Sequence, residues 1–431
     1  MNLGALRREP RTTRPYEDRR RAEASALLST VAARAAIAVH GTPVLLLDPA
    51  RVEAQYGRLR AALPFVGFHY AVKALAHEAV LDVLDGAGCG FDVATGEELR
   101  LLTRRGVEAT RIIHTHPIKK PAEIAEALAA GVRTFVVDNE AEIAKFHGTP
   151  ADTRLLVRLA YRSPHAKSDL SSKFGVGPFE AARLVESALA SGVRVAGFSY
   201  HVGSQLDDPP RFAAAAADTL ELMGILERRL NVQFDTLDIG GGLPASYDSE
   251  ASGIDEVAAA LRPVLAPHAR RLDIIAEPGR VMVAEAMSLI TSVVGVAERA
   301  DGRWYYLDDG LYGSYSNVLT EDVHPLVFAE RDLGGAGHDG RRRRPQDHRW
   351  ATLAGPTCDS SDVIAREVLL PDLQPGDLLV SPTMGAYTTV TATRFNGRPF
   401  TPVAVVDGGA VTGATALPRV ELRAPEGQTV P

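Results

Sequence analysis

Short runs of apolar and β-branched residues alternate with longer stretches rich in Ala, Leu and Glu over residues 68–277. Nearly every position in the short runs is apolar, as in strands that are buried on both faces of a parallel sheet. The longer stretches have helical composition, and several end at or beside a glycine, a common helix stop. The eight predicted strands are FHYAVK (68–73), GFDVA (90–94), RIIHT (111–115), TFVVD (134–138), RLLVRL (154–159), VAGFSYH (195–201), TLDIG (236–240) and IIAE (274–277).

Eight successive strand–helix units predict an α/β fold, a (β/α)8 barrel. An open, doubly wound sheet would give similar local patterns. The count of eight favours the barrel, which we expect to occupy residues 43–288.

The pattern changes after residue 288, where strands follow one another without regular helices between them. This predicts a mainly β domain over residues 289–431. Residues 1–42 read as a polar lead and an Ala-rich helix, which we expect to pack on the β domain. The four consecutive arginines at residues 341–344, within the segment 334–349, stand among Gly, Asp and Pro, which indicates a solvated loop rather than an anion site.

Composition and net charge argue against several classes of protein. The chain has 431 residues, 45% of them hydrophobic and 23% charged, and a net charge of −7. The negative charge argues against nucleic-acid binding through bulk charge. There is no apolar run long enough to span a membrane and no signal-peptide core at the N-terminus. Two cysteines cannot build a disulfide framework, so we expect a reduced, cytoplasmic protein.

Polar and ionisable residues stand where the predicted strands end. In this barrel architecture the carboxyl ends of the strands form the active site. One polar residue at a strand end needs no special explanation. A lysine, an arginine, histidines and several carboxylates on one face indicate a functional site. The residues at these ends are Lys73, Asp92, His114, Asp138, Arg158, His201, Gly240 and Glu277.

Lys73 follows the apolar run FHYAV. A lysine at the end of a buried strand is costly unless it is paired or deprotonated. An amine that burial keeps neutral is a nucleophile toward aldehydes, which makes Lys73 a candidate for a Schiff base.

Glycine-rich turns follow the last two predicted strands. Gly240, Gly241 and Gly242 come directly after TLDI, and EPGR contributes Gly279 and Arg280. The backbone N–H groups of such turns can approach an anion closely. The pattern is neither a Walker loop nor a dinucleotide fingerprint. Because the loops after strands seven and eight form the usual phosphate pocket of this barrel, the turns predict phosphate binding.

Seven motifs, spread over residues 40–410, carry a resemblance to a known family. The sequence resembles the pyridoxal-phosphate decarboxylases of the alanine-racemase-like fold, and within them the bacterial ornithine/lysine decarboxylases. The resemblance implies an N-terminal barrel, a C-terminal β domain, pyridoxal 5'-phosphate (PLP) as cofactor and a head-to-tail homodimer with shared active sites. The motifs are YAVKA around Lys73, FDVATGEE (91–98), HVGSQ (201–205), DIGGGLP (238–244), EPGR (277–280), GPTCDSSD (355–362) and GAYTTVTATRFNG (385–397).

The resemblance gives roles to individual barrel residues. Lys73 matches the lysine that carries PLP, and Glu277 matches the carboxylate that pairs with the pyridine nitrogen. Racemases of this fold typically have an arginine there, so Glu277 favours decarboxylation. His201 matches the imidazole stacked on the cofactor ring. Arg158, Asp92 and Glu98 match residues lining the cofactor and the lysine, and Ser204, Gly240, Gly241, Gly242, Gly279, Arg280 and Tyr387 match the phosphate cradle.

The β domain supplies further matches. Cys358 matches the cysteine that reaches into the partner subunit and protonates the carbanion after CO2 loss. Asp359 and Tyr387 match residues at the substrate, and Asp359 favours the ornithine/lysine branch because diaminopimelate decarboxylases commonly have Glu there. Where the family usually has an Asp that grips the distal amine, this chain has Glu321, followed by Asp322. Glu321 has the same charge as an Asp, but its side chain is one methylene longer, so its carboxylate extends further.

Two other positions have no matching role. His116 stands where the family often has Asn, and with His114 it forms a pair two residues apart. No third ligand is apparent, so we expect no metal. Cys89 lies in the turn GAGCGF and has no implied function.

The sequence therefore predicts PLP-dependent decarboxylation of a basic L-amino acid or a derivative, with a small-molecule substrate and no nucleic-acid or membrane partner. Two alternatives stay open. The enzyme could act on diaminopimelate or on a carboxylated polyamine or siderophore intermediate, or the chain could be a non-catalytic regulatory homologue. The presence of Lys73, Glu277, Cys358 and Tyr387 together argues against the regulatory alternative.

Overall fold

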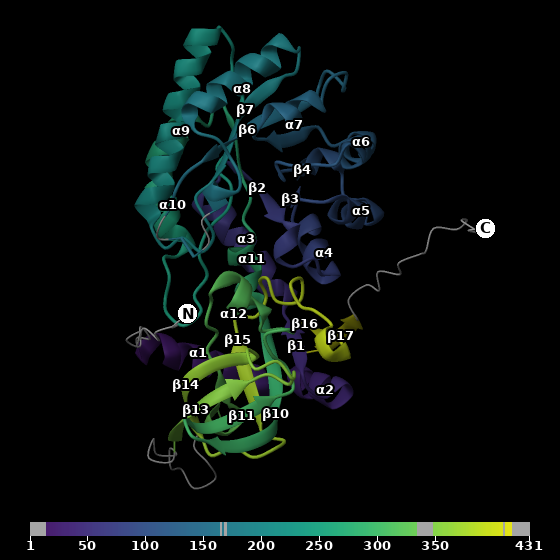
Figure 1. Cartoon of the computed structure of the whole chain (residues 1–431), viewed down its shortest axis with the longest axis vertical. Coiled ribbons are helices and arrows are strands. Elements are labelled where there is room, and N and C mark those ends of the chain that lie inside the picture. The colour runs from purple at the N-terminus through teal and green to yellow at the C-terminus, as the bar shows by residue number, and fades with distance from the viewer. Residues whose placement is uncertain (1–13, 164–165, 168–169, 334–347, 408–409, 416–431) are drawn as a thin grey trace, which may run out of the picture.

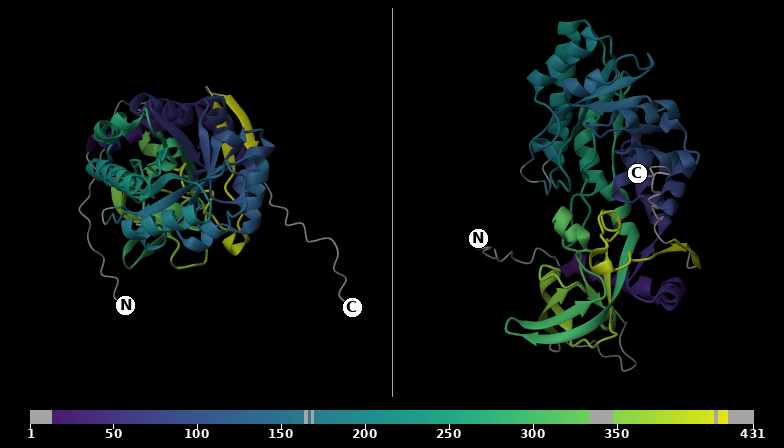
Figure 2. Two further views of the ribbon diagram at one scale, coloured as in Figure 1. Left: turned by 90° about the horizontal axis from the view of Figure 1, so that it is seen from above. Right: turned by 45° about the vertical axis from the view of Figure 1, so that its right-hand side comes forward.

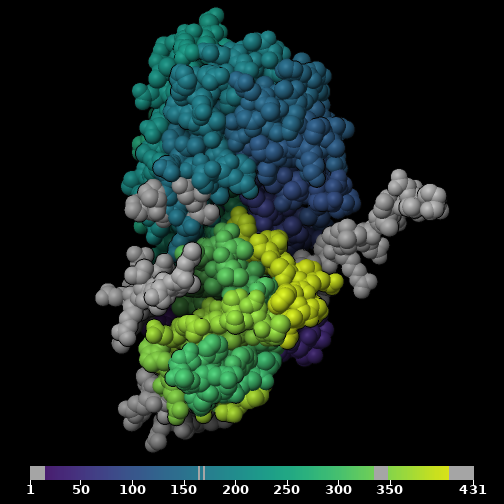
Figure 3. Space-filling model, in the orientation of Figure 1, coloured from purple at the N-terminus to yellow at the C-terminus, as the bar shows by residue number. Residues whose placement is uncertain are grey.

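The computed structural model describes residues 14–163, 166–167, 170–333, 348–407 and 410–415. The chain forms two lobes, a barrel and a β-sheet lobe, which meet at a waist (Figures 1 and 3). The predicted arginine-rich loop at residues 334–347 lies outside the described residues.

All eight predicted barrel strands are present, and they close into a parallel barrel in chain order, which confirms the predicted (β/α)8 fold. The barrel closes between the first and last strands, where Val66 lies opposite Ile274. The strands are β2 (Val66–Ala71), β3 (Gly90–Val93), β4 (Ile112–His114), β5 (Thr134–Val137), β6 (Arg154–Ala160), β7 (Val195–His201), β8 (Thr236–Asp238) and β9 (Asp273–Ala276).

Helices surround the barrel, as the left view of Figure 2 shows. Their ends follow local sequence signals. The longest helix starts after Asp208, whose side chain accepts from the Arg211 N–H, and it stops at Asn231 in the left-handed conformation. The barrel helices are α3 (Pro49–Ala62), α4 (Glu78–Gly86), α5 (Gly96–Arg104), α6 (Pro121–Ala130), α7 (Glu140–Ala144), α8 (Pro178–Ala190), α9 (Pro209–Leu230), α10 (Ile254–Leu265) and α11 (Arg280–Val283).

The middle of the barrel is filled by a separate apolar cluster. Its members come from five strands and are all buried: Ile113, Val136, Leu156, Ala196 and Ile275. Successive side chains of a strand point to opposite faces, so residues two positions further along also face the interior. This periodicity brings residues near the carboxyl ends of the strands to one mouth of the barrel.

The second lobe is a nine-stranded sheet with the main order β14-β13-β11-β10-β1-β16-β17, in which β15 pairs with β10 and β12. Its strands are β1 (Val44–Leu47), β10 (Met287–Arg299), β11 (Gly302–Leu307), β12 (Phe328–Ala329), β13 (His348–Ala354), β14 (Val363–Pro371), β15 (Leu378–Pro382), β16 (Val403–Asp407) and β17 (Ala410–Thr415). Short helices α12 (Ser316–Glu321) and α13 (Glu330–Leu333) lie between them in the chain.

The expected start of the barrel at residue 43 needs correction. The strand at that boundary, β1, pairs with β10 and with β16, so it belongs to the second sheet. The closed barrel begins at β2. The physical reason is that β1 finds its hydrogen-bonding partners more than 240 positions away, on strands of the β lobe.

Two N-terminal helices, α1 (Arg14–Ser29) and α2 (Val31–His40), precede β1. Their apolar side chains, including Leu28 and Ala33, share a buried cluster with Val44 and Ile290 of the second sheet. Among the described helices, none by itself is long and apolar enough to cross a membrane; α1 and α2 together pass that test, but they are bent by 68° relative to each other.

A loop of the β lobe, residues 383–389, reaches the barrel mouth. The N–H of Gly385 donates to the Ala284 carbonyl at 3.0 Å, and the N–H of Tyr387 donates to the Ala74 carbonyl at 3.0 Å. A Cβ on Gly385 would lie 1.8 Å from the Val283 carbonyl oxygen, so only glycine fits this approach. The two lobes therefore meet beside Lys73.

Candidate active site

Lys73 lies in the turn that follows β2, and its Nζ is 3.0 Å from Oδ2 of Asp92 on β3. Asp92 is buried, and its other oxygen accepts from the Thr115 hydroxyl. Burial alone would lower the pKa of Lys73, but the neighbouring carboxylate of Asp92 outweighs it and raises that pKa. The expectation that burial leaves this amine neutral is therefore wrong. Asp92 is the group placed to accept its proton.

Glu277 follows β9 and pairs with Asp238 at the end of β8. Burial, and then the charge of Asp238, raise the pKa of Glu277 well above its usual range. The oxygens of Asp238 accept from the Gly240 N–H and the Ser199 hydroxyl, each at 2.9 Å. These donors stabilise the charge of Asp238, so Glu277 holds the proton of the pair.

His201 ends β7, and its ring has a fixed tautomer. Its Nδ1 accepts from the Gly203 N–H at 3.0 Å, which leaves the ring proton on Nε2. Burial, and then the nearby charges of Arg158 and Lys73, lower its pKa well below the usual range. His201 is therefore a neutral imidazole.

The three glycines after β8 form a tight turn against the end of β7. Gly240 and Gly242 have φ values of +66° and +102°, which other residues rarely adopt. A Cβ would lie 2.0 Å from the Tyr200 carbonyl oxygen at Gly240 and 2.4 Å from that of Gly203 at Gly242. A Cβ at Gly241 would lie 3.2 Å from Nε2 of His201. A Cβ at Gly241 would also lie 2.7 Å from the Glu277 carbonyl oxygen, so the turn needs glycine at all three positions.

Arg280 begins α11 and is almost fully buried. Its guanidinium donates to the Tyr247 hydroxyl at 2.9 Å and to the Ser204 hydroxyl at 3.1 Å. It also pairs with Glu321. Its Nε is buried and has no hydrogen-bond partner among the described residues. Such a guanidinium and glycine-turn backbone N–H groups are donors of the kind that can hold an oxyanion such as phosphate, and we call Arg280, Ser204 and the glycine turn the cradle.

Tyr387 completes the mouth from the β lobe. Its ring lies 4.9 Å from the Arg280 guanidinium, and its backbone has the left-handed φ of +54°. Such a conformation costs about 1–3 kcal/mol and persists only where the surroundings fix it. Gly279 packs close by, since a Cβ there would lie 3.1 Å from that of Ala74. The structure therefore gathers Tyr387, Arg280 and Lys73 at one mouth.

Three other residues from the strand ends have different surroundings. His114 follows Ile113 of the interior cluster and so points away from the barrel interior, where burial lowers its pKa to about 4. Asp138 accepts from the Gly175 N–H at 3.0 Å and anchors that loop. Arg158 lies over the Phe174 ring at 5.4 Å.

Two residues without an assigned role are placed as follows. His116 accepts from the Ile118 N–H and contacts Phe174 edge-on. Cys89 is buried, with its thiol near the Phe68 carbonyl, and burial raises its pKa to about 12. Glu98, matched as a supporting carboxylate, accepts from the Ala94 N–H at 2.6 Å, and burial raises its pKa.

Cys358 and Asp359 lie in the loop between β13 and β14, and within one chain no described hydrogen bond connects them to the barrel. The Cys358 N–H donates to Asn396, and Asp359 accepts from the Tyr312 hydroxyl at 2.5 Å. That hydroxyl lowers the pKa of Asp359. The cysteine is free and exposed.

Glu321 ends α12 and points into the cradle. Its carboxylate contacts Arg280 and accepts from the Ser204 hydroxyl at 3.4 Å. Its neighbour Asp322 pairs instead with Lys167 at 3.0 Å. A phosphate in the cradle would therefore share Arg280 with Glu321, while the predicted contact of Glu321 with a substrate amine stays a prediction.

The sequence analysis missed four residues of this site. Asp238 was present in the DIGGG motif, directly before the glycines, and its place at a strand end could have found it. Ser199 and Thr115 also belong to strand ends, but common hydroxyl residues give no signal by themselves. Tyr247 follows the glycine turn in a loop, and only the fold brings it to Arg280.

The chain was compared with known protein families and structures. Residues 49–284 match the family model for the pyridoxal-dependent decarboxylase, pyridoxal binding domain. A lysine/ornithine decarboxylase of Selenomonas ruminantium is 33% identical over 85% of this chain and 90% of its own length. An antizyme inhibitor 2 of Xenopus laevis is 34% identical over 80% of this chain and 77% of its own length.

Comparison with solved structures points to the same family. The crystal structure of a lysine/ornithine decarboxylase from Vibrio vulnificus, complexed with cadaverine, superimposes with a TM-score of 0.79 at 39% identity. The match covers 87% of this chain and 97% of that one. The likeness therefore includes both lobes and the mouth between them.

Proposed function

The chain belongs to the PLP-dependent ornithine/lysine decarboxylase family, and we propose that it removes CO2 from a basic L-amino acid, ornithine- or lysine-like, or from a derivative of one. The observation that carries this proposal is the mouth of the barrel. There an amine-bearing residue, Lys73, lies at the same mouth as a buried carboxyl pair and an oxyanion cradle.

The residues of this mouth fit PLP. The glycine turn after β8 packs so closely against its neighbours that no Cβ is accommodated, and the buried Nε of Arg280 has no hydrogen-bond partner among the described residues. Ser204 and Tyr387 would complete the phosphate contacts, and Lys73 would hold the aldehyde end. When bound, PLP supplies an electron sink for the carbanion that CO2 leaves behind.

Each side chain of the mouth then has a defined task. Asp92 accepts a proton from Nζ of Lys73, because its Oδ2 lies 3.0 Å away. Glu277 holds a proton that it can share with a ring nitrogen, and Asp238 maintains that proton by its own charge. His201 offers the face of a neutral ring whose orientation the Gly203 N–H fixes.

The substrate end of the site extends into the β lobe. We propose that Glu321 and Asp359 bind the distal cation of the substrate and that Cys358 donates the proton that replaces CO2. Within one chain, Cys358 and Asp359 bond only to residues of their own lobe among the described contacts. A homodimer in which each β lobe completes the partner's barrel would bring these residues to Lys73. We further propose a cytoplasmic enzyme of amino-acid and polyamine metabolism.

The test is CO2 release from lysine, ornithine, arginine, 2,4-diaminobutyrate and diaminopimelate by the PLP-loaded protein. We expect the highest kcat/KM with a basic amino acid. Lys73→Ala should lose the visible absorbance band of lysine-bound PLP and several orders of magnitude in turnover. Turnover restricted to diaminopimelate would instead support the alternative substrate class.

The likeness to an antizyme inhibitor supports a second candidate, a regulatory protein that works by binding. The presence of Lys73, with Asp92 at 3.0 Å, speaks for catalysis. A protein that binds no PLP and releases no CO2 from any substrate of the panel would favour the regulatory function.

A further inference from the structure

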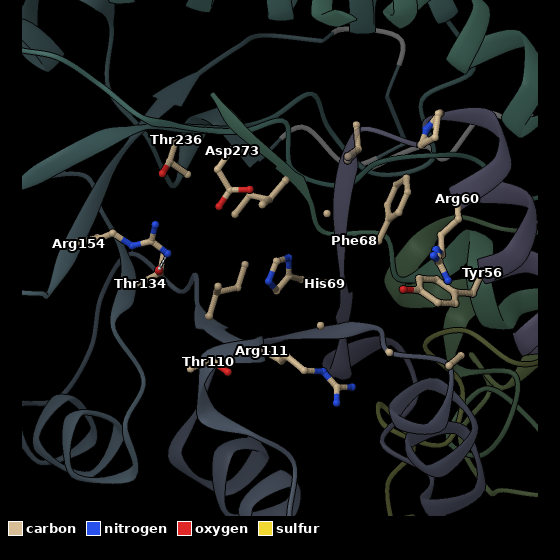
Figure 4. Close-up of a pocket in the computed structure, with 18 residues that line it drawn as sticks. Tyr56, Arg60, Phe68, His69, Thr110, Arg111, Thr134, Arg154, Thr236 and Asp273 are labelled. Atoms are coloured by element: carbon tan, nitrogen blue, oxygen red, sulfur yellow. Dashed lines mark hydrogen bonds between the residues drawn. The ribbon is translucent and has the colours of Figure 1, made fainter. Parts of the chain in front are cut away.

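The opposite mouth of the barrel contains a cavity of about 530 Å³. It opens among the amino-terminal ends of the strands, and Figure 4 shows its lining, with His69 near the centre and arginines around it. Its volume is within the range of about 300–1,000 Å³ that is usual for small-molecule sites. None of the residues in the proposed active site lines it.

The cavity exists because this end of the barrel lacks bulky interior side chains. A barrel of this kind is normally filled by layers of side chains. Here Gly67 contributes no side chain, and the His69 ring occupies the space beside Gly90, where a Cβ would lie 2.5 Å from it. Ile113 and Ile275 of the interior cluster form the apolar floor.

The lining is positively charged. Arg60 and Arg154 have no carboxylate within 4.0 Å among the described residues, whereas Arg111 pairs with Asp85 at 2.8 Å. Opposing them, Asp273 is the carboxylate in the lining. Arg60, which lies over the Tyr56 ring, and Arg154 therefore carry positive charges that no described carboxylate neutralises.

Hydroxyl groups accompany these arginines. Thr134 and Thr236 are buried and line the same space. The Arg154 guanidinium is held in place by its bond to the Thr134 hydroxyl at 2.9 Å. An arginine fixed in this way presents its remaining N–H groups to a bidentate oxyanion with little loss of side-chain entropy.

We propose that this cavity is a second binding site, which takes a small organic or inorganic polyanion through its phosphate or carboxylate groups. Arg154 and Arg60, on opposite sides of the cavity in Figure 4, each bind an anionic group of the ligand, and the apolar floor limits its depth. The layer of Ile113, Val136, Leu156, Ala196 and Ile275 separates this site from the catalytic mouth. On β6, Arg154 starts the strand beside the cavity, and Arg158 lies four residues further toward the catalytic mouth, about 13 Å away along an extended strand.

The test is isothermal titration of the PLP-loaded protein with inorganic phosphate and with citrate, against sodium chloride at the same ionic strength. Loading with PLP occupies the cradle at the other mouth, which would otherwise bind phosphate. We expect saturable binding of at least one probe. Binding of phosphate alone identifies phosphate groups as the ligand chemistry, and binding of citrate alone identifies carboxylates. Heats no larger than those of chloride for both probes would overturn the proposal.

Variants that should change the affinity in opposite directions distinguish an effect on binding from damage to the fold. Arg154→Gln and Arg60→Gln should each weaken binding by about tenfold, the value of a charge-assisted hydrogen bond. Asp273→Asn should strengthen it, because a like charge is removed. Arg349→Gln, on the exposed face of β13 and also without a described carboxylate partner, should change nothing. Unchanged affinity in both arginine variants, or weakening by Asp273→Asn, would refute the site.

Discussion

Glu277 and Asp238 are two carboxyl groups buried together, and at the residue scale they distinguish this site most clearly. Two like charges in such surroundings cannot both ionise freely, so one keeps its proton. The donors from Ser199 and Gly240 favour the ionised form of Asp238. Glu277 is therefore the protonated partner, which suits a residue that shares a proton with a cofactor ring.

The first prediction is that Glu277→Gln separates cofactor binding from chemistry. The oxyanion cradle does not include Glu277, so PLP affinity should change little, while kcat for decarboxylation should fall by about a hundredfold or more. Absorbance titration and CO2 release measure the two properties. Glu142→Gln, a buried acid on α7, is the control and should keep its activity. Equal kcat in the Glu277→Gln protein and the wild type would remove this role.

The second prediction concerns pH. A raised pKa means that folded Glu277 binds a proton more tightly than unfolded Glu277. Above the ordinary pKa of 4.5 the folded state therefore holds more protons, and the free energy of unfolding of the PLP-free protein should fall as pH rises. Lys73 adds no slope there, because both states keep it protonated below its ordinary pKa of 10.5.

Denaturant unfolding of the PLP-free protein between about pH 5 and pH 8 measures this decline. Glu277→Gln cannot titrate, so its stability should fall less over the same range. Parallel pH profiles for the two proteins would show that Glu277 has no raised pKa.

The glycine turn after β8 shows how an element sets the site at the next scale. Its conformation brings the backbone close against the end of β7 and against Glu277. Gly242 combines a φ of +102° with a Cβ position 2.4 Å from the Gly203 carbonyl oxygen. Side chains on the strands supply the reactive groups, and this turn sets how closely the backbone approaches them.

The third prediction is that Gly242→Ala disrupts the cradle. Backbone strain and crowding should together lower the free energy of unfolding by about 1–3 kcal/mol and weaken PLP binding. Gly148→Ala is the matched control, since Gly148 also has a positive φ of +74° but no atom within 4 Å of its Cβ position. It should lose some stability and keep its PLP affinity. PLP affinity lost equally in both variants would mean that strain alone, not the cradle, is measured.

At the scale of the whole molecule, Lys73 lies in the barrel and Cys358 lies in the β lobe. This separation is the basis of the proposed shared site. Tyr387 reaches Lys73 from its own chain through the loop at residues 383–389. Cys358 and Asp359 have their described hydrogen bonds within the β lobe. A two-fold dimer would use each surface twice, once on each protomer.

The fourth prediction tests this symmetry by mixing Lys73→Ala and Cys358→Ala proteins. In a mixed dimer one site keeps both residues and the other lacks both. Random exchange makes half of the protomers heterodimeric, so about a quarter of wild-type activity should return. CO2 release before and after subunit exchange measures it. If exchange is demonstrated and activity stays at the average of the two parents, both residues act within one chain.

Much of the barrel could be read from the sequence, because its signals are local. Apolar runs of four to eight residues that alternate with helical stretches over eight successive units indicate the buried strands of a parallel barrel. The end of such a run marks one mouth of the barrel, and so Lys73, Asp92 and Glu277 were identified without coordinates. The glycine turn after β8 could also be recognised from the sequence, because no other residue permits this conformation.

Other features depended on residues far apart in the sequence. The apolar run of β1 does not reveal whether it pairs with the barrel or with β10 and β16, because a strand's partners are set by the hydrogen-bonding edge that is available. The strand β14 carries two exposed charges, Arg366 and Glu367, which weaken the apolar pattern by which a strand is recognised in the sequence.

Protonation states also depend on residues that are far apart in the sequence. Local patterns indicate that Lys73, Asp92 and Glu277 stand at the mouth, but the charge of each group depends on the fold. A pKa depends on burial and on neighbours within a few ångströms, and these neighbours come from different strands. Asp92 of β3 keeps Lys73 charged, Asp238 of β8 keeps Glu277 protonated, and Glu321 of the β lobe reaches Arg280 only because the two lobes fold together.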